Sequence, residues 1–155
     1  MEKPEIRHAV ASHLADYSLR LYATEEYLSR SGTPQRPSDL SDHPLNYYVE
    51  SVLTVDDLDR AVAQLPRMRR GVASTNIIAH VTATLAGAGI GLLPDYVAQK
   101  DPRLKPVLHE EIRHPLSYWA VIRPDAMRNP AVEAVYSALA EAGRSAETQI
   151  APDFS

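Results

Sequence analysis

The sequence has no cysteine among its 155 residues. Disulfide bonds, thiolate metal ligands and cysteine nucleophiles are therefore excluded. An excess of positive charge is also missing, because 20 acidic residues outnumber 16 Lys and Arg residues and give a net charge of −4. An acidic chain has no overall attraction for the phosphate backbone of a nucleic acid. We therefore expect no direct nucleic-acid contact by this chain.

Long hydrophobic runs are absent as well. Residues 1–5 are polar and no continuous apolar run follows them, so the sequence predicts neither a signal peptide nor a membrane span. The cytoplasm is the expected location. The composition itself is ordinary, with 45% hydrophobic and 23% charged residues, which is typical of a folded globular protein. One compact domain is expected at this length.

Apolar periodicity and capping residues predict alternating strands and helices. Thr24 and Asn129 are placed to cap helices, and Gly32, Gly87 and Gly143 are placed to end them. The predicted elements are a strand over 18–23, a helix over 25–30, a helical turn over 37–40, a strand over 45–53, a helix over 58–65 capped from 54–57, a strand over 71–73, a helix over 77–85, a strand over 90–93, a strand over 105–108, a strand over 116–122 and a helix over 130–143.

Residues 72–94 predict one βαβ unit with a binding site at its crease. A short strand ends at Ser74-Thr75-Asn76, and a glycine-containing turn after the helix leads into a buried strand. The crossover connection predicts parallel strands and a right-handed turn. The start of the helix carries free N–H groups that face beyond the carboxyl edge of the sheet. Such an edge can hold a small polar or anionic molecule.

The residues around this crease have structural as well as binding interpretations. Either Ser74 or Thr75 is expected to cap the helix, which stabilises it by about 1 kcal/mol and leaves the neighbouring side chain for a ligand. His80 lies one turn further on, where it can approach the site or simply pack in the interior. Tyr47 and Tyr48 are consecutive residues of a predicted strand, so only one of them can face the site.

The sequence shows no catalytic constellation, no metal site and no cofactor motif. Gly87 and Gly89 follow a helix and precede a strand, which is the reverse of a phosphate-binding loop. Two charged clusters predict solvated connections rather than sites. These clusters are His109, Glu110, Glu111 and His114, and Arg67, Arg69 and Arg70.

A series of short motifs follows in a fixed order from about residue 9 to residue 142. They are Leu21-Tyr22-Ala23-Thr24, Tyr27-Leu28, Gly32-Thr33-Pro34, Asp39-Leu40, His43-Pro44-Leu45, Ser74-Thr75-Asn76, Ala86-Gly87-Ala88-Gly89-Ile90, Leu93-Pro94, Leu104, Pro106-Val107-Leu108 and Tyr118-Trp119. In this order they resemble the effector-binding region of LysR-type transcriptional regulators.

The resemblance implies an α/β fold. It corresponds to one lobe of a periplasmic-binding-protein-like type 2 domain, with a mixed, mostly parallel sheet flanked by helices, plus a return strand and a C-terminal helix. The resemblance places the second effector lobe at about 18–108 and the return to the first lobe at about 116–143, within a domain fragment over 1–143. A flexible tail is expected over 144–155. The winged helix-turn-helix and most of the first lobe are expected to be missing.

The resemblance also implies a function. It indicates a domain that senses a small-molecule effector and oligomerises, without enzyme activity or a cofactor, while an N-terminal module absent from this chain binds DNA. The effector contacts are carried over to Ser74, Thr75 and Asn76 and, by a looser match, to His43 and Tyr48. The expected partners are an inducer such as a carboxylate or aromatic acid and further copies of the chain in a homodimer or higher oligomer. No membrane partner is expected.

Two other functions are compatible with the residues. A truncated regulator can act as a free-standing interaction module, because an apolar strand over 116–122 with an unpaired edge seeks a partner. A small α/β hydrolase would use Ser74 as nucleophile and His80 or His43 as base. Ser74 lacks the flanking glycines of a nucleophile elbow, and no acidic residue is clearly placed to orient either histidine.

Overall fold

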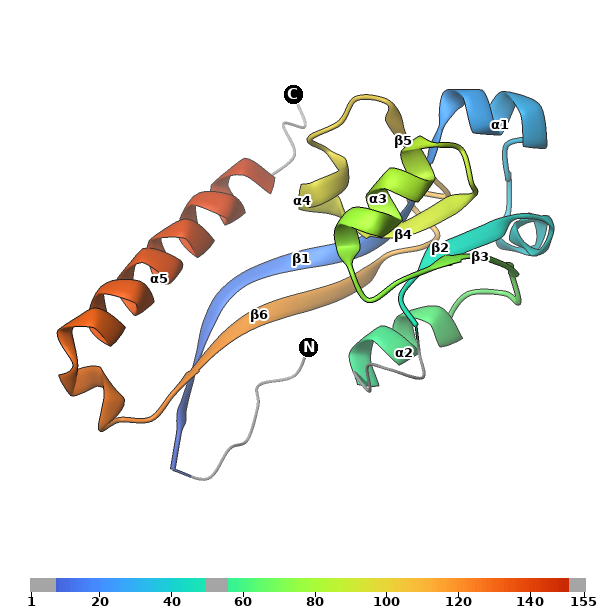
Figure 1. The fold of residues 1–155 in the computed structure, drawn as a ribbon. Coiled ribbons are helices and arrows are strands. Elements are labelled where there is room, and N and C mark those ends of the chain that lie inside the picture. Colours follow the sequence, from blue (N-terminus) through green and yellow to red (C-terminus); the bar gives the residue numbers. More distant parts are fainter. Residues whose placement is uncertain (1–7, 50–55, 151–155) are drawn as a thin grey trace. The chain divides into compact units, whose positions relative to one another are not determined.

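The computed structural model describes residues 8–49 and 56–150 and separates the chain into two compact units. Unit 2 is the continuous segment Ser18–His114, and unit 1 is formed by the chain before and after it. Both boundaries fall inside strands, one in β1 (Val10–Thr24) and one in β6 (His114–Ile122), as can be followed in Figure 1. Each unit is described here by itself.

The sheet of unit 2 is mixed. Its strand order is β3 (Arg69–Ala73), β2 (Pro44–Tyr47), β4 (Ile90–Pro94), β1 and β5 (Leu104–Val107), and β6 also pairs with β1. Strand β2 pairs in parallel with both of its neighbours, whereas β1 is antiparallel to β4 and to β5. Strand β1 therefore runs against β2 to β5, which confirms the predicted mixed, mostly parallel sheet.

All the predicted helices are present, and the structure adds two short ones, α4 (Asp95–Ala98) and the 3₁₀ turn η2 (Ala126–Arg128). The predicted ones are α1 (Glu25–Ser31), the 3₁₀ turn η1 (Pro37–Asp42), α2 (Asp56–Ala63), α3 (Ile77–Leu85) and α5 (Pro130–Ile150). The Thr24 hydroxyl accepts the N–H of Tyr27, and Gly32 adopts a φ of +89° after α1. The capping and ending signals of the first helix are thus confirmed.

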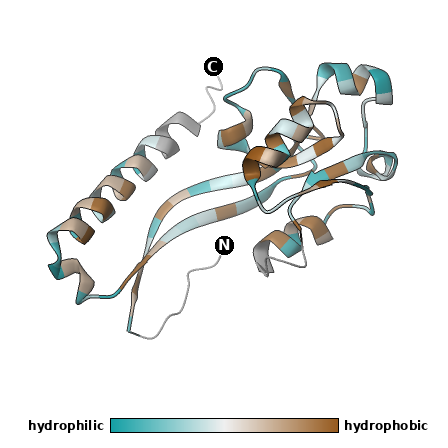
Figure 2. Ribbon diagram, viewed as in Figure 1, coloured by the Kyte–Doolittle hydropathy of each residue, from teal (hydrophilic) through white to brown (hydrophobic). Residues whose placement is uncertain are grey.

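The core of unit 2 is built around β4, where every residue is buried. The apolar stripe of α3 packs against it, with Val81 and Leu85 lying on a cluster that contains Tyr22, Leu93 and Leu104. Figure 2 shows hydrophobic colouring along α3 and β4. The predicted helical stripe is therefore the surface that joins α3 to the sheet.

The two strands of the predicted βαβ unit, β3 and β4, are not neighbours in the sheet. Strands β3 and β4 have the same direction, as predicted, but β2 lies between them and pairs with both. Gly89, with a φ of +156°, makes the turn into β4, and a Cβ there would collide with the Pro44 carbonyl oxygen. Gly87 follows α3 with a φ of +71°.

The bounds of two predicted strands differ in the structure, and the short helix α4 was not predicted. Strand β2 ends at Tyr47 rather than at residue 53, although residues 50–53 and the predicted cap residues 54–55 lie outside the described residues. The short helix α4 was not predicted because four residues carry too little periodic pattern. Arg69 and Arg70, predicted in a solvated turn, belong to β3.

The C-terminal helix α5 continues to Ile150, so the prediction of a flexible tail from residue 144 is wrong for 144–150. Residues 151–155 lie outside the described part of the chain. Gly143 therefore lies inside α5 and does not end it. Its lack of a side chain lets the α5 backbone pass close to β1, within unit 1. A Cβ at position 143 would collide with the carbonyl oxygen of Leu14 in β1.

Unit 1 is held together by contacts between β1 and β6. The ring of Tyr17 stacks on that of Tyr118 at 4.6 Å, and the Ser117 hydroxyl donates to the Asp16 carboxylate at 2.6 Å. The start of α5 agrees with the prediction, since the Asn129 side chain accepts the N–H of Ala131 at 3.0 Å.

Candidate functional site

The candidate site is the carboxyl edge of β2 and β3, where both parallel strands end. Tyr47 of β2 lies in register with Ala73 of β3, and the N–H of Ser74 donates to the Tyr47 carbonyl oxygen at 3.2 Å. The loop 74–76 therefore leaves β3 beside the point where Tyr48 follows β2. In parallel sheets this is the edge at which ligands bind.

Asn76, rather than Ser74 or Thr75, caps α3. Its Oδ1 accepts the N–H of Ile78 at 2.9 Å, and its backbone is extended, with φ −115° and ψ 121°. The Ser74 hydroxyl instead accepts the N–H of Asn76 at 3.1 Å and stabilises the turn before the helix. The prediction that Ser74 or Thr75 caps the helix is therefore wrong. Thr75 is exposed, and its hydroxyl has no hydrogen-bond partner among the described residues.

His80 packs beneath this loop. Its Nε2 lies 2.8 Å from the carbonyl oxygen of Ser74, and the residue is only 4% exposed. A carbonyl only accepts, so Nε2 carries the proton and Nδ1 is left as an acceptor. Within the described part of the chain, Nδ1 has no hydrogen-bond partner. His80 is thus a packed histidine that positions the loop backbone.

Tyr47 and Tyr48 are both buried at the end of β2. Their rings meet edge to face, with centroids 4.6 Å apart, and Tyr47 also lies against His80 at 6.1 Å. The expected alternation does not apply to them, because the strand already ends at Tyr47. The Tyr48 hydroxyl donates to the carboxylate of Asp59 in α2. Tyr48 therefore forms a wall of the edge, with its hydroxyl already bonded.

The structure does not bring His43 to this edge. It precedes β2, and its carbonyl oxygen accepts the N–H of Arg69 at the start of β3, so it lies at the opposite end of both strands. Its Nδ1 is bonded to the Tyr27 hydroxyl at 2.8 Å, and its ring is buried. Burial lowers the pKa of His43 below its usual value of 6.5.

A buried polar network that the sequence did not reveal fixes α3 against the two strands. The Asn46 amide donates to the Thr84 hydroxyl at 3.3 Å and accepts the N–H of Val72 at 3.0 Å. Thr84 donates in turn to the carbonyl oxygen of His80 at 2.8 Å. Asn46 and Thr84 are fully buried. The available signal was an asparagine inside an apolar strand, which needs a partner when buried.

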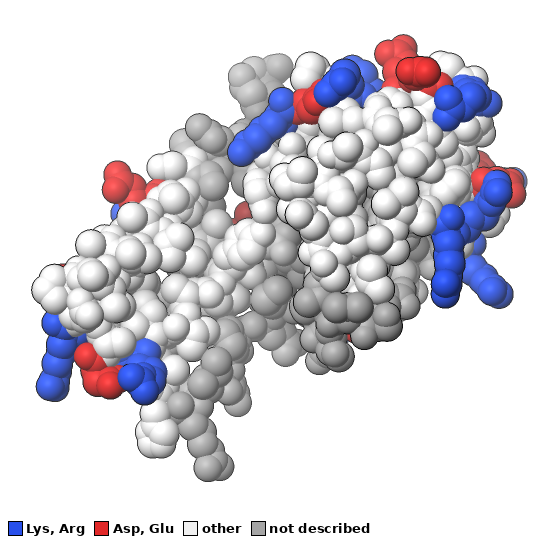
Figure 3. Space-filling model, viewed as in Figure 1, with Lys and Arg blue, Asp and Glu red and all other residues white. Residues whose placement is uncertain are grey.

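The chemistry of the edge is polar but uncharged. Residues 71–94 contain no Asp, Glu, Lys or Arg, and Figure 3 shows a broad uncharged face over α3. A ligand at the loop 74–76 meets hydroxyl, amide and backbone N–H groups. The described residues contain no group of three or more His, Cys, Asp or Glu side chains that could hold a metal ion.

Asp95 is a buried ionisable residue at the carboxyl end of β4, and sequence reasoning missed it. It follows β4 directly and is buried. Its carboxylate accepts the N–H of Ser18 at 3.3 Å and that of Tyr96 at 2.9 Å. These bonds give Asp95 a structural function, because the first joins α4 to β1 and the second lies at the start of α4.

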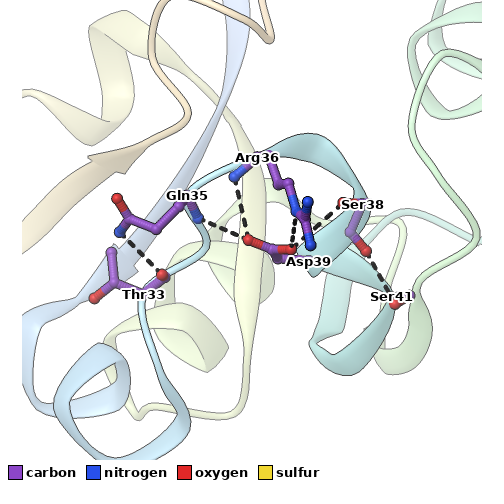
Figure 4. Close-up of polar contacts among 6 residues, drawn as sticks. All are labelled: Thr33, Gln35, Arg36, Ser38, Asp39 and Ser41. Carbon is purple, nitrogen blue, oxygen red and sulfur yellow. Dashed lines mark hydrogen bonds and ion pairs between the residues drawn. The ribbon is translucent and has the colours of Figure 1, made fainter.

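A cluster of polar side chains on the surface lies elsewhere, at η1. The Asp39 carboxylate accepts backbone N–H groups of Gln35 and Arg36 and the Arg36 side chain at 3.0 Å (Figure 4). The Arg36 guanidinium, followed by the Gln35 N–H, lowers the pKa of Asp39. All these bonds are local in sequence, so the cluster stabilises the start of η1.

The arrangement does not form a serine nucleophile with its base. His80 bonds the carbonyl oxygen of Ser74 rather than its hydroxyl, and His43 lies at the other end of β2. Nucleophilic catalysis needs the hydroxyl and the base within hydrogen-bond distance. The geometry therefore gives no support to the hydrolase alternative.

Comparison with known proteins decides the family. The model of the LysR substrate binding domain matches residues 2–144. The chain belongs to the LysR substrate-binding domain family. The resemblance found in the sequence motifs is thereby confirmed. This family comprises effector-binding domains of transcriptional regulators, which are not enzymes. Comparison with the curated proteins gives no match.

Solved structures agree with this assignment. The LysR domain is similar to the regulatory domain of CrgA, a LysR-type transcriptional regulator from Neisseria meningitidis, with 29% identity and a TM-score of 0.68 over 89% of this chain and 71% of that one. Against a longer CrgA structure the identity is 27% and the TM-score 0.71, over 88% of this chain and 48% of that one. The LysR domain thus spans about half of that longer chain.

A third structure shows the fold alone. The full-length Vibrio cholerae virulence activator AphB is 17% identical, with a TM-score of 0.70 over 92% of this chain and 50% of that one. The periplasmic-binding-protein-like type 2 fold is confirmed by these neighbours. Among residues 8–49 and 56–150, no helix combines the length and apolar character that a membrane span requires.

Proposed function

We propose that this LysR domain senses a small-molecule effector and oligomerises as part of a cytoplasmic transcription regulator, whose DNA binding resides in a separate module. The family match over residues 2–144 and the similarity to the CrgA regulatory domain support this function. The net charge of −4 supports the assignment of DNA binding to another module.

The effector site that we propose is the loop Ser74-Thr75-Asn76 at the carboxyl edge of β2 and β3. The observation that carries it is the exposed Thr75 hydroxyl, which has no partner among the described residues, beside the start of α3. A helix start favours an anion through its N–H groups and its dipole. We therefore propose a small carboxylate or an aromatic acid as the effector, with Tyr48 as a neighbouring wall. His43 is left out of this site because it lies at the other end of β2.

Calorimetric titration of acetate, succinate, benzoate and salicylate tests this site. At least one of them should bind, and the double variant Ser74→Ala with Thr75→Ala should weaken that binding about tenfold, the effect of one or two lost hydrogen bonds. The matched control is Thr33→Ala with Ser41→Ala, which removes two hydroxyls near η1 (Figure 4). Equal affinity in the two double variants would remove Ser74 and Thr75 from the site. Failure of all four acids to bind would contradict the carboxylate class.

Oligomerisation is supported by exposed apolar side chains in unit 1. Val135 and Leu139, one turn apart on α5, are 61% and 49% exposed, and Tyr118 and Val121 of β6 are exposed as well. Contiguous exposed apolar surface is typical of association sites. Light scattering after size-exclusion chromatography should show a dimer or larger species that Val135→Glu with Leu139→Glu dissociates. A monomer at all concentrations would contradict the proposal.

A further inference from the structure

A cavity of about 450 Å³ opens between α2 and the strand pair β2–β3. Leu45 and Asn46 are consecutive strand residues and therefore face opposite sides of the sheet. Asn46 bonds Thr84 of α3, whereas Leu45 lines the cavity. The cavity thus lies on the side of β2 that α3 does not cover. Its volume is within the range of small-molecule sites.

The walls of this cavity are mostly apolar. Leu45 contributes from β2, Val62 from α2, and Leu65 and Met68 from the segment that joins α2 to β3. Tyr48 also lines the cavity, and its hydroxyl is bonded to Asp59. Such walls suit a flat or compact apolar group of a ligand, because its burial removes apolar surface of both the ligand and the cavity from water.

Three arginines, Arg67, Arg69 and Arg70, give the cavity its charge. They follow one another within four positions of a chain whose net charge is negative. None of their guanidinium groups forms an ion pair or side-chain hydrogen bond with a residue in the part of the chain that is described. Neighbouring like charges repel, and an anion bound between them relieves that repulsion. A guanidinium also matches a carboxylate with two parallel hydrogen bonds.

We propose that this cavity binds a small amphipathic carboxylate, with its apolar body against Val62, Leu65 and Met68 and its carboxylate on the arginines. This cavity adjoins the effector edge, because Tyr48 and Ala73 also line it, but its charge lies at the opposite end of β3. Arg69 begins β3 whereas Ser74 follows its end, and residues 71–94 supply no cation. The LysR domain then has two sites of different preference, a polar edge and an apolar cavity with a basic rim.

Fluorescence titration of the whole chain with 1-naphthoate, and with 1-naphthamide as its uncharged counterpart, tests the proposal. The acid should bind about tenfold more tightly than the amide, the effect expected of one charge-assisted hydrogen-bonded pair. The variant Arg67→Gln with Arg69→Gln should remove this preference and leave the amide affinity unchanged. Val62→Trp should fill the cavity and abolish binding of both probes.

The matched control is Arg123→Gln with Arg128→Gln, which removes two charges from unit 1 and should leave both affinities unchanged. Equal affinities of acid and amide, or an unchanged acid affinity in Arg67→Gln with Arg69→Gln, would overturn the proposal. Loss of naphthoate binding in Ser74→Ala with Thr75→Ala, but not in the arginine variant, would assign the probe to the effector edge and also overturn it. Thermal unfolding of each variant shows whether it has folded. If Val62→Trp does not fold, the arginine variants still decide the test, because those side chains are exposed and their replacement does not disturb the interior.

Discussion

His80 Nε2 donates a hydrogen bond to the Ser74 carbonyl oxygen at 2.8 Å, so the second turn of α3 holds the loop that precedes the helix. The same loop is held from the other side, because the N–H of Ser74 donates to Tyr47. The two backbone groups of Ser74 are therefore bonded to different elements, the carbonyl oxygen to α3 and the N–H to β2. The loop offers a ligand a backbone that is already ordered, which reduces the entropy cost of binding.

Replacing His80 with phenylalanine keeps a ring in the same space and removes this donor. We expect a loss of about 1 kcal/mol in the free energy of unfolding, because the Ser74 carbonyl loses its bonded partner. Amide hydrogen exchange at residues 74–76 should become faster. His109→Phe is the control, since that ring is exposed. Unchanged exchange at 74–76 would show that the histidine does not hold the loop.

Replacing Asn46 with alanine should be much more costly than its size suggests. The substitution leaves the Val72 N–H and the Thr84 hydroxyl without their buried partner. We expect a loss of about 2 kcal/mol or more in urea unfolding, since each unsatisfied buried group costs on the order of 1–3 kcal/mol. Gln35→Ala removes an exposed amide and should change stability little. Similar losses in the two variants would contradict the importance of the network.

Gly143→Ala separates two explanations of this glycine. A glycine in the middle of a helix is about 1 kcal/mol less favourable than alanine, so helix propensity alone predicts stabilisation. The collision with the Leu14 carbonyl oxygen predicts the reverse, a loss on the order of 1–3 kcal/mol from overpacking. Thermal unfolding gives the sign. Ala138→Gly, at an exposed position of the same helix, is the reference for propensity without the contact.

His43 should make stability depend on pH. Burial lowers the pKa of His43 in the folded chain below 6.5, which outweighs the attraction of Asp42 and Asp39. As the pH falls, His43 therefore takes up its proton in the unfolded chain before it does so in the folded chain. The contribution of the neutral His43 to the stability of the fold is complete above about pH 6.5 and is lost as the pH falls through the lowered pKa. Urea unfolding between pH 7 and pH 5 should show a shallower slope for His43→Gln than for the unchanged chain.

Sequence reasoning located most elements because their signals are local. Thr24 and Gly32 bound α1 in the structure as they do in the pattern, and the stripe of α3 faces the core. Sequence reasoning failed where contacts with residues distant in the sequence determine the local structure. Gly143 looked like a helix end because the sequence does not show that Leu14 lies against it, and β2 stops at Tyr47 although strand-type residues continue.

The site was predicted in part for the same reason. The loop 74–76 is visible as a strand followed by polar residues and a helical stripe. Which of its side chains caps the helix depends on backbone angles that the residue types alone do not fix, and Asn76 satisfied that need in place of Ser74 or Thr75. His43 was included from a motif match, and only the strand direction shows that it lies at the far end of β2.

The division of the chain inside β1 and β6 has a consequence for the order of folding. Unit 2 is one continuous segment, whereas contacts within unit 1, such as the Asp16 to Ser117 hydrogen bond, join residues 101 positions apart. If so long a loop closed before unit 2 had folded, the loss of chain entropy would be offset by only a few contacts. The bond from Arg113 to the Ser18 hydroxyl, inside unit 2, closes that loop in advance. We expect unit 2 to acquire protected amides first and the two chain ends to pair afterwards.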